Sequence, residues 1–344
     1  MSSATHRRPH RQSRHNEGVS EPSAVTITNS VDAAVVGLLA GALVAFATET
    51  VYGLGALATD ESAVARVFKV KGRPTGHPLI VHLPDRGQLD RWSRDYPAWA
   101  LALAESLWPG PLTLVVPRSS LASDALTGGQ ATVGLRVPSH PMALDLLRAV
   151  GTAVAAPSAN RFGGVSPTTA QHVVDDLGPY LDPTRDLVLD GGPCDVGVES
   201  TIVLAIDDVP RLLRPGAISE QAIADITGRA VGVADSSVRA PGTLPSHYSP
   251  HATVIPCTAD ELARVTGFTP ETAGLIAEAH IATPPTLRRL ASPVGVDNYA
   301  RELYAALRAA DRAGLSHVVA VPPEGNHGLS AAIRDRLIRA AHSS

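Results

Sequence analysis

Regular alternation of apolar and polar positions begins at residue 24 of the chain. The run AVTIT, an amphipathic stretch over 31–39 and the run ALVAFAT predict a strand, a helix and a strand in that order. Later apolar runs predict strands over 79–83, 112–117, 132–138, 153–159, 187–192, 200–205 and 211–216, and helical spacing predicts helices near 60–69, 97–107, 141–149 and 168–177. Because strands outnumber helices and several follow one another directly, we expect a mixed α/β (α+β) domain with a twisted mixed sheet and flanking helices.

The periodicity stops over residues 229–251, which contain three prolines and many small residues. This segment is typical of a linker and separates a first domain over 24–228 from a second over 252–344. In the second domain, strand-like runs at 252–257, 273–277 and 317–322 alternate with helical stretches, which predicts a small, mainly parallel, Rossmann-like α/β domain. Residues 1–23 are rich in Arg, His and Ser and are predicted to form a disordered basic tail.

Composition limits the function classes. The chain has 344 residues, is 44% hydrophobic and carries a net charge of −4, so binding of nucleic acid by overall charge is not expected. The arginines of the tail leave open a weak, local contact with RNA such as tRNA or, in a eukaryote, a transit peptide, but we favour a merely solvated tail. Two widely separated cysteines, Cys194 and Cys257, argue against a disulfide framework, and no apolar run reaches ~20 residues. We therefore expect a cytoplasmic protein without a membrane anchor.

The first motif with chemical potential is TETVYGLG, at residues 48–55. Gly53 and Gly55 would allow a tight turn whose backbone amides face a ligand, and the threonine hydroxyls and Glu49 add polar groups. A strand followed by glycines is more often structural, so this motif is weak alone. No GxGxxG or GxxxxGK[ST] loop occurs in the chain, so any nucleotide phosphates must be held by another device.

A second motif, KVKGRPTGHPLIVH at 69–82, gathers cationic side chains around a loop rich in proline and glycine. Such cations repel one another unless an anion neutralises them, although a solvated basic loop is the simpler alternative. His82 lies within an apolar strand, where a polar residue without a role is costly. The spacing of His77 and His82 matches no standard zinc pattern, so we disfavour a zinc site.

Arginine also occurs where core residues are expected. Arg136 lies among apolar neighbours in VGLRVPSHP (133–141), and a buried arginine needs an anionic partner, either a carboxylate or a ligand. The loop AAPSANRFGGVSPT (155–168) offers amides and hydroxyls for phosphate, or is only a turn-rich connection. Ser200 and Arg214 lie at strand edges. Without a recognisable nucleophile motif, these groups favour electrostatic handling of phosphate over covalent catalysis.

Eight motifs in order, TETVYGLG, KGRPTGHPLIVH, WPGPLT, VGLRVPSHP, APSANRFGGVSPT, GPCDVGVESTIV, LLRPG and APGTLPSHYSP, closely resemble the L-threonylcarbamoyladenylate (threonylcarbamoyl-AMP) synthase family with its YrdC-type domain. The resemblance covers residues 30–251, and the later segments LYAALRAADRAGLSHVVAV and GLSAAIRDRL are similar to the family's accessory C-terminal domain. Residues 279–297 match that accessory domain poorly.

The resemblance implies an ATP-dependent nucleotidyltransferase that makes L-threonylcarbamoyl-AMP from L-threonine and bicarbonate or CO₂, with release of pyrophosphate and with Mg²⁺ accompanying ATP. A downstream tRNA threonylcarbamoyl transferase would receive the product. The implied L-threonine ligands are Thr50, His82, Arg136, Ser200 and the backbone at Ala156. The implied ATP ligands are Arg73, His77, Thr132, Ser158, Ser166, Arg214 and Tyr248, and Lys71, Arg73 and Arg136 are the implied catalytic residues. No protein metal ligand is implied.

Two further implications concern mechanism and coupling. A carbamate formed on threonine would attack the α-phosphorus in line, with positioning and charge supplying most of the rate. Tyr248 lies in the predicted linker, which would cross the site. Two other interpretations stay open: a non-catalytic RNA-binding module with a basic concave surface, and a carbamoyl-phosphate-using relative from hydrogenase maturation.

Overall fold

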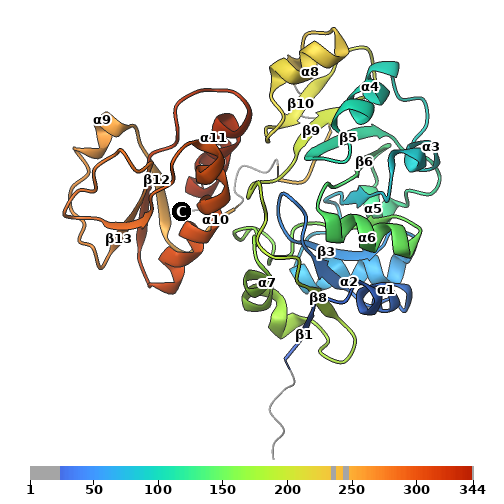
Figure 1. The fold of residues 1–344 in the computed structure, drawn as a ribbon, viewed down its shortest axis with the longest axis horizontal. Helices are drawn as coiled ribbons and strands as arrows, with labels where there is room; N and C mark the ends of the chain where they lie inside the picture. Colours follow the sequence, from blue (N-terminus) through green and yellow to red (C-terminus); the bar gives the residue numbers. More distant parts are fainter. Residues whose placement is uncertain (1–23, 234–237, 243–247, 343–344) are drawn as a thin grey trace, which may run out of the picture.

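The computed structural model describes residues 24–233, 238–242 and 248–342. Two bodies are visible, the first coloured blue to yellow and the second orange to red (Figure 1). The predicted disordered tail at 1–23 lies outside the described residues, as does part of the predicted linker. No helix within the described ranges is both long and apolar enough to cross a membrane.

The first body is built on one sheet of eleven strands, ordered β1-β8-β2-β3-β7-β4-β6-β5-β9-β10-β11. In chain order the strands are β1 (Thr26–Thr28), β2 (Val44–Phe46), β3 (Gly53–Leu57), β4 (Ile80–His82), β5 (Leu112–Pro117), β6 (Thr132–Arg136), β7 (Val154–Ala155), β8 (Leu187–Leu189), β9 (Thr201–Leu204), β10 (Arg211–Arg214) and β11 (Gly232–Val233). Both parallel and antiparallel pairs occur, for example β4 with β6 and β5 with β6. The predicted mixed sheet is confirmed.

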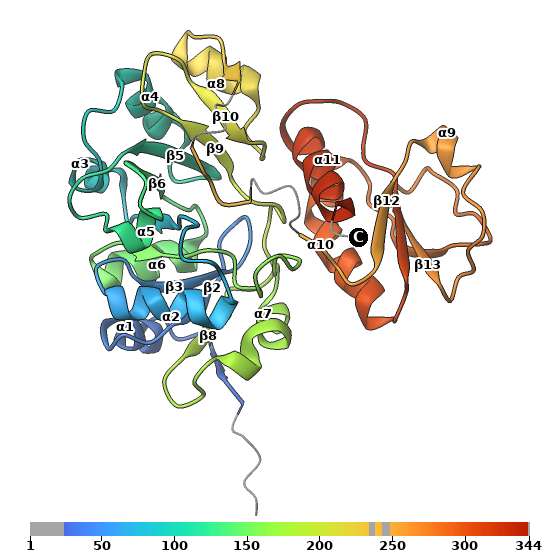
Figure 2. The same cartoon turned by 180° about the vertical axis from the view of Figure 1, so that it is seen from behind.

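Helices cover both faces of this sheet (Figures 1 and 2). The longer ones are α1 (Val31–Leu39), α2 (Glu61–Lys71), α4 (Ala98–Leu107), α6 (Pro141–Val150), α7 (Ala170–Leu177) and α8 (Glu220–Thr227), and α3 (Leu89–Trp92) and α5 (Asp124–Thr127) are single turns. Helices α1 and α6 pack on one face, whereas α2, α4 and α7 pack on the other. Buried aliphatic side chains fill both layers, as the low aromatic content suggests.

Glycines in the TETVYGLG motif do not form the turn expected from the sequence. Gly53 and Gly55 instead belong to β3, a buried strand that pairs with β2 and β7. A Cβ on Gly55 would lie 2.8 Å from a ring carbon of Phe46 and 2.9 Å from a methyl of Val154. Glycine is therefore required there for close packing of neighbouring elements, and not for a phosphate-binding loop.

The second body holds a four-stranded sheet, ordered β12-β15-β13-β14, in which every pair is parallel. Its elements are β12 (Thr253–Pro256), α9 (Ala259–Leu262), β13 (Ala273–Ile276), β14 (Arg288–Ala291), α10 (Val296–Arg312), β15 (His317–Ala320) and α11 (Gly328–Ala341). The predicted parallel α/β arrangement is confirmed. Strand β14 was not predicted, because its sequence RRLA carries two arginines and lacks an apolar run.

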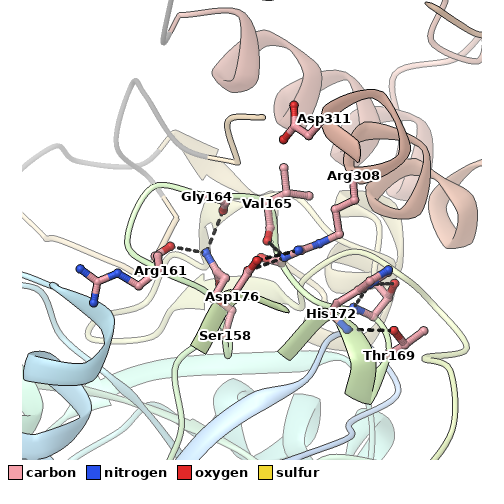
Figure 3. Close-up of polar contacts among 12 residues, drawn as sticks. Ser158, Arg161, Gly164, Val165, Thr169, His172, Asp176, Arg308 and Asp311 are labelled. Atoms are coloured by element: carbon pink, nitrogen blue, oxygen red, sulfur yellow. Dashed lines mark hydrogen bonds and ion pairs between the residues drawn. The ribbon is translucent and has the colours of Figure 1, made fainter. Parts of the chain in front are cut away.

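Helices α10 and α11 lie on the side of the second body that faces the first (Figures 1 and 2). Arg308 of α10 forms an ion pair with Asp176 of α7, with a closest N–O distance of 2.6 Å, and also donates to the carbonyl oxygen of Val165 (Figure 3). An apolar cluster joins Val165 and Val198 of the first body to Leu303 and Leu307 of α10. The two bodies are therefore held by both apolar and charged contacts.

Candidate active site

A cavity opens where several strands of the large sheet end side by side. His82 and Arg136, the last residues of β4 and β6, are aligned neighbours in a parallel pair. The other polar groups come from β10, from segments that adjoin β2, β7 and β9, from the loop after α2 and from the linker. Nine of the thirteen predicted site residues line this cavity, which we call the cationic cleft: Thr50, Arg73, His82, Arg136, Ala156, Ser158, Ser200, Arg214 and Tyr248.

Arg136 is 4% exposed and is held from three directions. One nitrogen lies 2.7 Å from a carboxylate oxygen of Glu49, another donates to the hydroxyl of Thr50 at 2.9 Å, and Nε donates to the carbonyl of Gly110 at 3.3 Å. The sequence required an anionic partner for this arginine, and the protein supplies one in Glu49. From the sequence, Glu49 could be identified only as a polar group. Its pair with Arg136 joins positions far apart in the chain, and local sequence patterns do not report such contacts.

The imidazole of His82 is buried beside Arg136. Burial and, secondly, the positive charge of Arg136 lower the pKa of His82 to about 3. The ring is therefore neutral at physiological pH, and it can exchange hydrogen bonds with a ligand without adding charge.

Ser200 and Arg214 contribute a hydroxyl and a guanidinium to the wall of the cleft. Arg214 donates to the hydroxyl of Ser200 at 3.1 Å and to its carbonyl at 2.9 Å. The hydroxyl of Ser200 also lies 2.7 Å from that of Thr113, a fully buried residue of β5. Burial lowers the pKa of Arg214, but its partners leave it a cation at the edge of the cleft.

Lys71 and Arg73 are close in sequence, but their side chains contact different groups. Arg73 lines the cleft and donates to the carbonyl of Pro78 at 2.9 Å. Lys71 is not among the lining residues, because its ammonium is directed at the backbone carbonyls of Ser158 and Asn160. Burial lowers the pKa of Lys71 well below its usual value. The ammonium of Lys71 therefore holds the backbone of the 158–160 loop, and the catalytic role implied for Lys71 stays a prediction.

Three other predicted residues lie next to the cleft but not on its wall. His77 lies beside Phe162, with ring centroids 5.3 Å apart. Thr132 lines a smaller neighbouring cavity together with Arg239 and Pro241. The hydroxyl of Ser166 donates to Glu199 at 2.6 Å. Pro241, in the described part of the linker, lines both cavities.

Glu199 connects this site to the second body. It lines the cleft, and its carboxylate accepts hydrogen bonds from Tyr304 of α10 at 2.8 Å and from Arg336 of α11 at 2.9 Å. Burial opposes ionisation of Glu199, but the charges of Arg336 and Arg214 outweigh burial and hold its pKa at about 2. The carboxylate is thus ionised and paired across the domain boundary. Local sequence patterns do not report a pair formed by residues so far apart in the chain.

Tyr248 closes the cleft from the linker side. Its ring stacks on Tyr304 with centroids 5.9 Å apart, and the guanidinium of Arg336 lies 5.2 Å from the centroid of the Tyr248 ring. The backbone of Tyr248 is left-handed, with φ of 65°, a conformation that a bulky residue rarely adopts without compensating contacts. Pro241, Gly242 and Tyr248 line the cleft, which measures about 50 Å³. Ligand sites for small molecules are typically ~300–1,000 Å³, so the cleft is small for such a site.

The described residues contain no group of three or more His, Cys, Asp or Glu side chains that could hold a metal ion. The cleft wall carries one carboxylate, Glu199, and that group is already paired with Arg336. A metal in this cleft would therefore need most of its oxygen ligands from a bound phosphate.

A cleft of guanidinium groups, hydroxyls and one neutral imidazole, at the strand ends of a twisted mixed sheet, defines an enzyme of the class that positions anionic substrates and stabilises developing charge. The family model described as telomere recombination (Sua5/YciO/YrdC) matches residues 37–216, and the model of the threonylcarbamoyl-AMP synthase C-terminal domain matches residues 218–342. The chain belongs to the threonylcarbamoyl-AMP synthase family, in its two-domain form. The family and enzyme class predicted from the eight motifs are confirmed.

Similar proteins span nearly the whole chain. Threonylcarbamoyl-AMP synthase of Pyrococcus abyssi is 38% identical over 316 residues, covering 88% of this chain and 91% of that protein. The Bacillus subtilis protein of the same name is 38% identical over 320 residues, covering 87% and 89%. The crystal structure of P. abyssi Sua5 complexed with L-threonine superposes with a TM-score of 0.80 at 35% identity, covering 92% of this chain and 97% of that one.

Proposed function

We propose that this chain forms L-threonylcarbamoyl-AMP from ATP, L-threonine and bicarbonate or CO₂, releasing pyrophosphate, and that the product serves N6-threonylcarbamoyladenosine modification of tRNA next to the anticodon. The observation that carries the proposal is the Arg136 cluster in a cleft rich in cations, in a chain whose relatives bear the synthase name. A related protein binds L-threonine in its crystal structure. The RNA-binding alternative is not favoured, and the cytoplasm stays a prediction.

Arg136 is suited to the carboxylate of L-threonine. A guanidinium has five N–H donors, of which two donate to Thr50 and Gly110. The contact with Glu49 is an ion pair without hydrogen-bond geometry, so donors remain for a ligand. Glu49 neutralises the buried charge without consuming these remaining donors. The substrate carboxylate would then add a second anion to a preorganised arginine.

The hydroxyl of Thr50 has a fixed polarity. Thr48 donates its hydroxyl proton to the carbonyl of Val51 at 2.6 Å, so in the 2.8 Å contact between the two threonine hydroxyls Thr50 must be the donor. Since Arg136 also donates to Thr50, the cleft meets only a remaining lone pair of that oxygen. We propose that Thr50 accepts a hydrogen bond from the amine or hydroxyl of the substrate.

In the proposed reaction, the amine of L-threonine reacts with CO₂ or bicarbonate to form a carbamate, and water is released in the bicarbonate case. A carbamate oxygen then attacks the α-phosphorus of ATP while pyrophosphate leaves. Arg73 and Arg214 would hold phosphate oxygens as charge shifts toward the leaving group, and Ser158 would contribute a further polar contact. Mg²⁺ bound to the ATP phosphates would neutralise part of their charge.

The remaining assignments are proposals of the same kind. His82, Ser200 and the Ala156 backbone would complete the L-threonine site, and His77, Thr132, Ser166 and Tyr248 would contribute to ATP binding. The product is a mixed anhydride and therefore labile in water. A downstream tRNA threonylcarbamoyl transferase is the proposed recipient.

The test is detection of L-threonylcarbamoyl-AMP by mass spectrometry, together with pyrophosphate release from ATP and Mg²⁺. We expect product only when L-threonine and bicarbonate are both present. Arg136→Ala should lower kcat/KM about 10²- to 10⁴-fold, the range for removing one member of a buried charge pair. Arg86→Ala, which removes an exposed ion pair with Glu105, is the matched control and should retain activity. Absence of the adenylate from well-folded wild-type protein would overturn the proposal.

A further inference from the structure

The second body contains a cavity far larger than the cationic cleft. It measures about 660 Å³, within the usual range for a small-molecule site. Its walls are the segments that directly follow β12, β13 and β15, together with residues of α11. We call it the edge cavity and define it by Cys257, Glu278, Glu324 and Arg334. No step of the proposed reaction uses it.

The edge cavity lies where an open parallel sheet provides a natural crevice. Leu262 of α9 packs with Leu275 and Val319 on one face of the sheet. Leu337 of α11 packs with Val254 and Val318 on the opposite face. The neighbouring parallel strands β12 and β15 therefore send their chains to opposite faces. Ligands of open α/β sheets bind outside the carboxyl ends of strands at such a switch point.

Charged groups in the edge cavity are largely uncommitted. Asp260, Glu278 and Glu324 line it and form no ion pair with any described residue. Arg334 likewise forms none among these residues, makes only 3.4 Å contacts to the carbonyls of Pro323 and Gly325, and has a buried Nε without an acceptor in the described ranges. A ligand with a carboxylate for Arg334 and a protonated amine for the acidic groups would satisfy both signs of charge.

We propose that the edge cavity binds a small molecule of the amino-acid class, with its carboxylate on Arg334 and its amine among Asp260, Glu278 and Glu324. The excess of acidic groups favours a ligand with a second amine. Helix α11 contributes to both sites. Arg334 lines the edge cavity, and Arg336, which lies about 200° further around the helix, contacts Glu199 of the cationic cleft. Occupancy of the edge cavity is therefore placed to influence the cleft through α11.

Isothermal titration of the full-length protein tests the site with L-lysine as the probe. Cadaverine, which lacks the carboxylate, and glutarate, which lacks the amine, are the comparison probes. The titrations use the Arg136→Ala variant, so that binding in the cationic cleft does not contribute. We expect saturable L-lysine binding, with both comparison probes weaker by about tenfold or more.

Variants then locate the binding. Arg334→Gln and Glu278→Gln should each weaken L-lysine binding about tenfold, whereas Glu271→Gln, an exposed change just before β13 and hence at the opposite edge of the sheet, should not. Equal binding of L-lysine and cadaverine would contradict the role of Arg334. No saturable binding of L-lysine, or binding unaffected by either cavity variant, would overturn the proposal. These outcomes do not depend on synthase activity.

Discussion

The two bodies differ in whether the charged side chains of their cavities are ion-paired. In the cationic cleft two buried ion pairs hold charges, Arg136 with Glu49 and Glu199 with Arg336, and the guanidinium groups of Arg73 and Arg214 donate to carbonyl oxygens. In the edge cavity, Glu278, Glu324 and Arg334 are not ion-paired with any described residue and face open space. The cleft is about 50 Å³ and the edge cavity about 660 Å³.

This difference follows from burial. A charge removed from water must find a partner, because the cost of desolvating it is several kcal/mol, whereas a charge at an open edge keeps its hydration. The cleft is therefore preorganised before any substrate arrives, and the second body helps to organise it through Tyr304 and Arg336. The following changes test this contrast, in order of decreasing effect.

The largest effect is expected from Arg336→Met. The change leaves the buried carboxylate of Glu199 without its charged partner, so the free energy of unfolding should fall by about 3–5 kcal/mol. Denaturant titration measures it. The double variant with Glu199→Gln should recover part of the loss. If the double variant recovers none of the lost free energy of unfolding, Arg336 acts through packing alone.

Glu49→Gln tests the same principle within the cleft. Arg136 would keep its charge but lose the carboxylate that orients it. We expect KM for L-threonine to rise roughly 10- to 100-fold with a smaller change in kcat, because the orientation of a binding group is lost. Steady-state kinetics with varied L-threonine measure this. An unchanged KM would show that Glu49 does not position Arg136.

As the pH falls, the depressed pKa of His82 should destabilise the folded protein at a higher pH than protonation of Glu199 does. The pKa of His82 is about 3 in the folded protein, below the ordinary value near 6.5, so the unfolded chain binds a proton that the folded chain does not. Between pH ~6.5 and ~4.5 this group alone should lower the free energy of unfolding by about 1.4 kcal/mol per pH unit. Glu199, with a pKa of about 2, adds its loss only below pH ~4.5.

Denaturant titrations at several pH values, compared between wild type and His82→Gln, check this slope. The variant should show a shallower dependence of stability on pH over the same range. Identical slopes in the two proteins would contradict the assignment of a depressed pKa to His82.

The smallest effect is expected at exposed charges. Arg86 and Glu105 form a 2.6 Å ion pair with both side chains about half exposed. Glu105→Ala should change the free energy of unfolding by no more than about 0.5 kcal/mol, because water and salt screen the pair. Arg334→Gln should be similarly small, despite lying only two residues from Arg336. A loss of free energy of unfolding well above this value in either variant would contradict the difference between buried and exposed charges.

Much of the fold was predictable because apolar runs report local burial. Strand β5 was predicted with its observed bounds, and the need of Arg136 for an anion followed from its apolar neighbours. What could not be predicted depends on contacts distant in sequence. The direction of Lys71 toward the 158–160 loop and the packing that requires Gly55 both arise only once the sheet is assembled.

The pairing of Glu199 with Arg336 joins two domains and leaves no periodic signal. Partner choice at such a distance is set by tertiary packing. The arginines of the cleft could therefore be identified as candidates one by one, but Glu199 and the network that joins these residues could not.

Exchange of labelled pyrophosphate into ATP tests the central claim most directly, because it reports reversible attack on the α-phosphorus in the cationic cleft. We predict exchange only when L-threonine and bicarbonate are both present, and its loss in Arg136→Ala. Exchange that does not require L-threonine, or release of inorganic phosphate in place of pyrophosphate, would contradict the account.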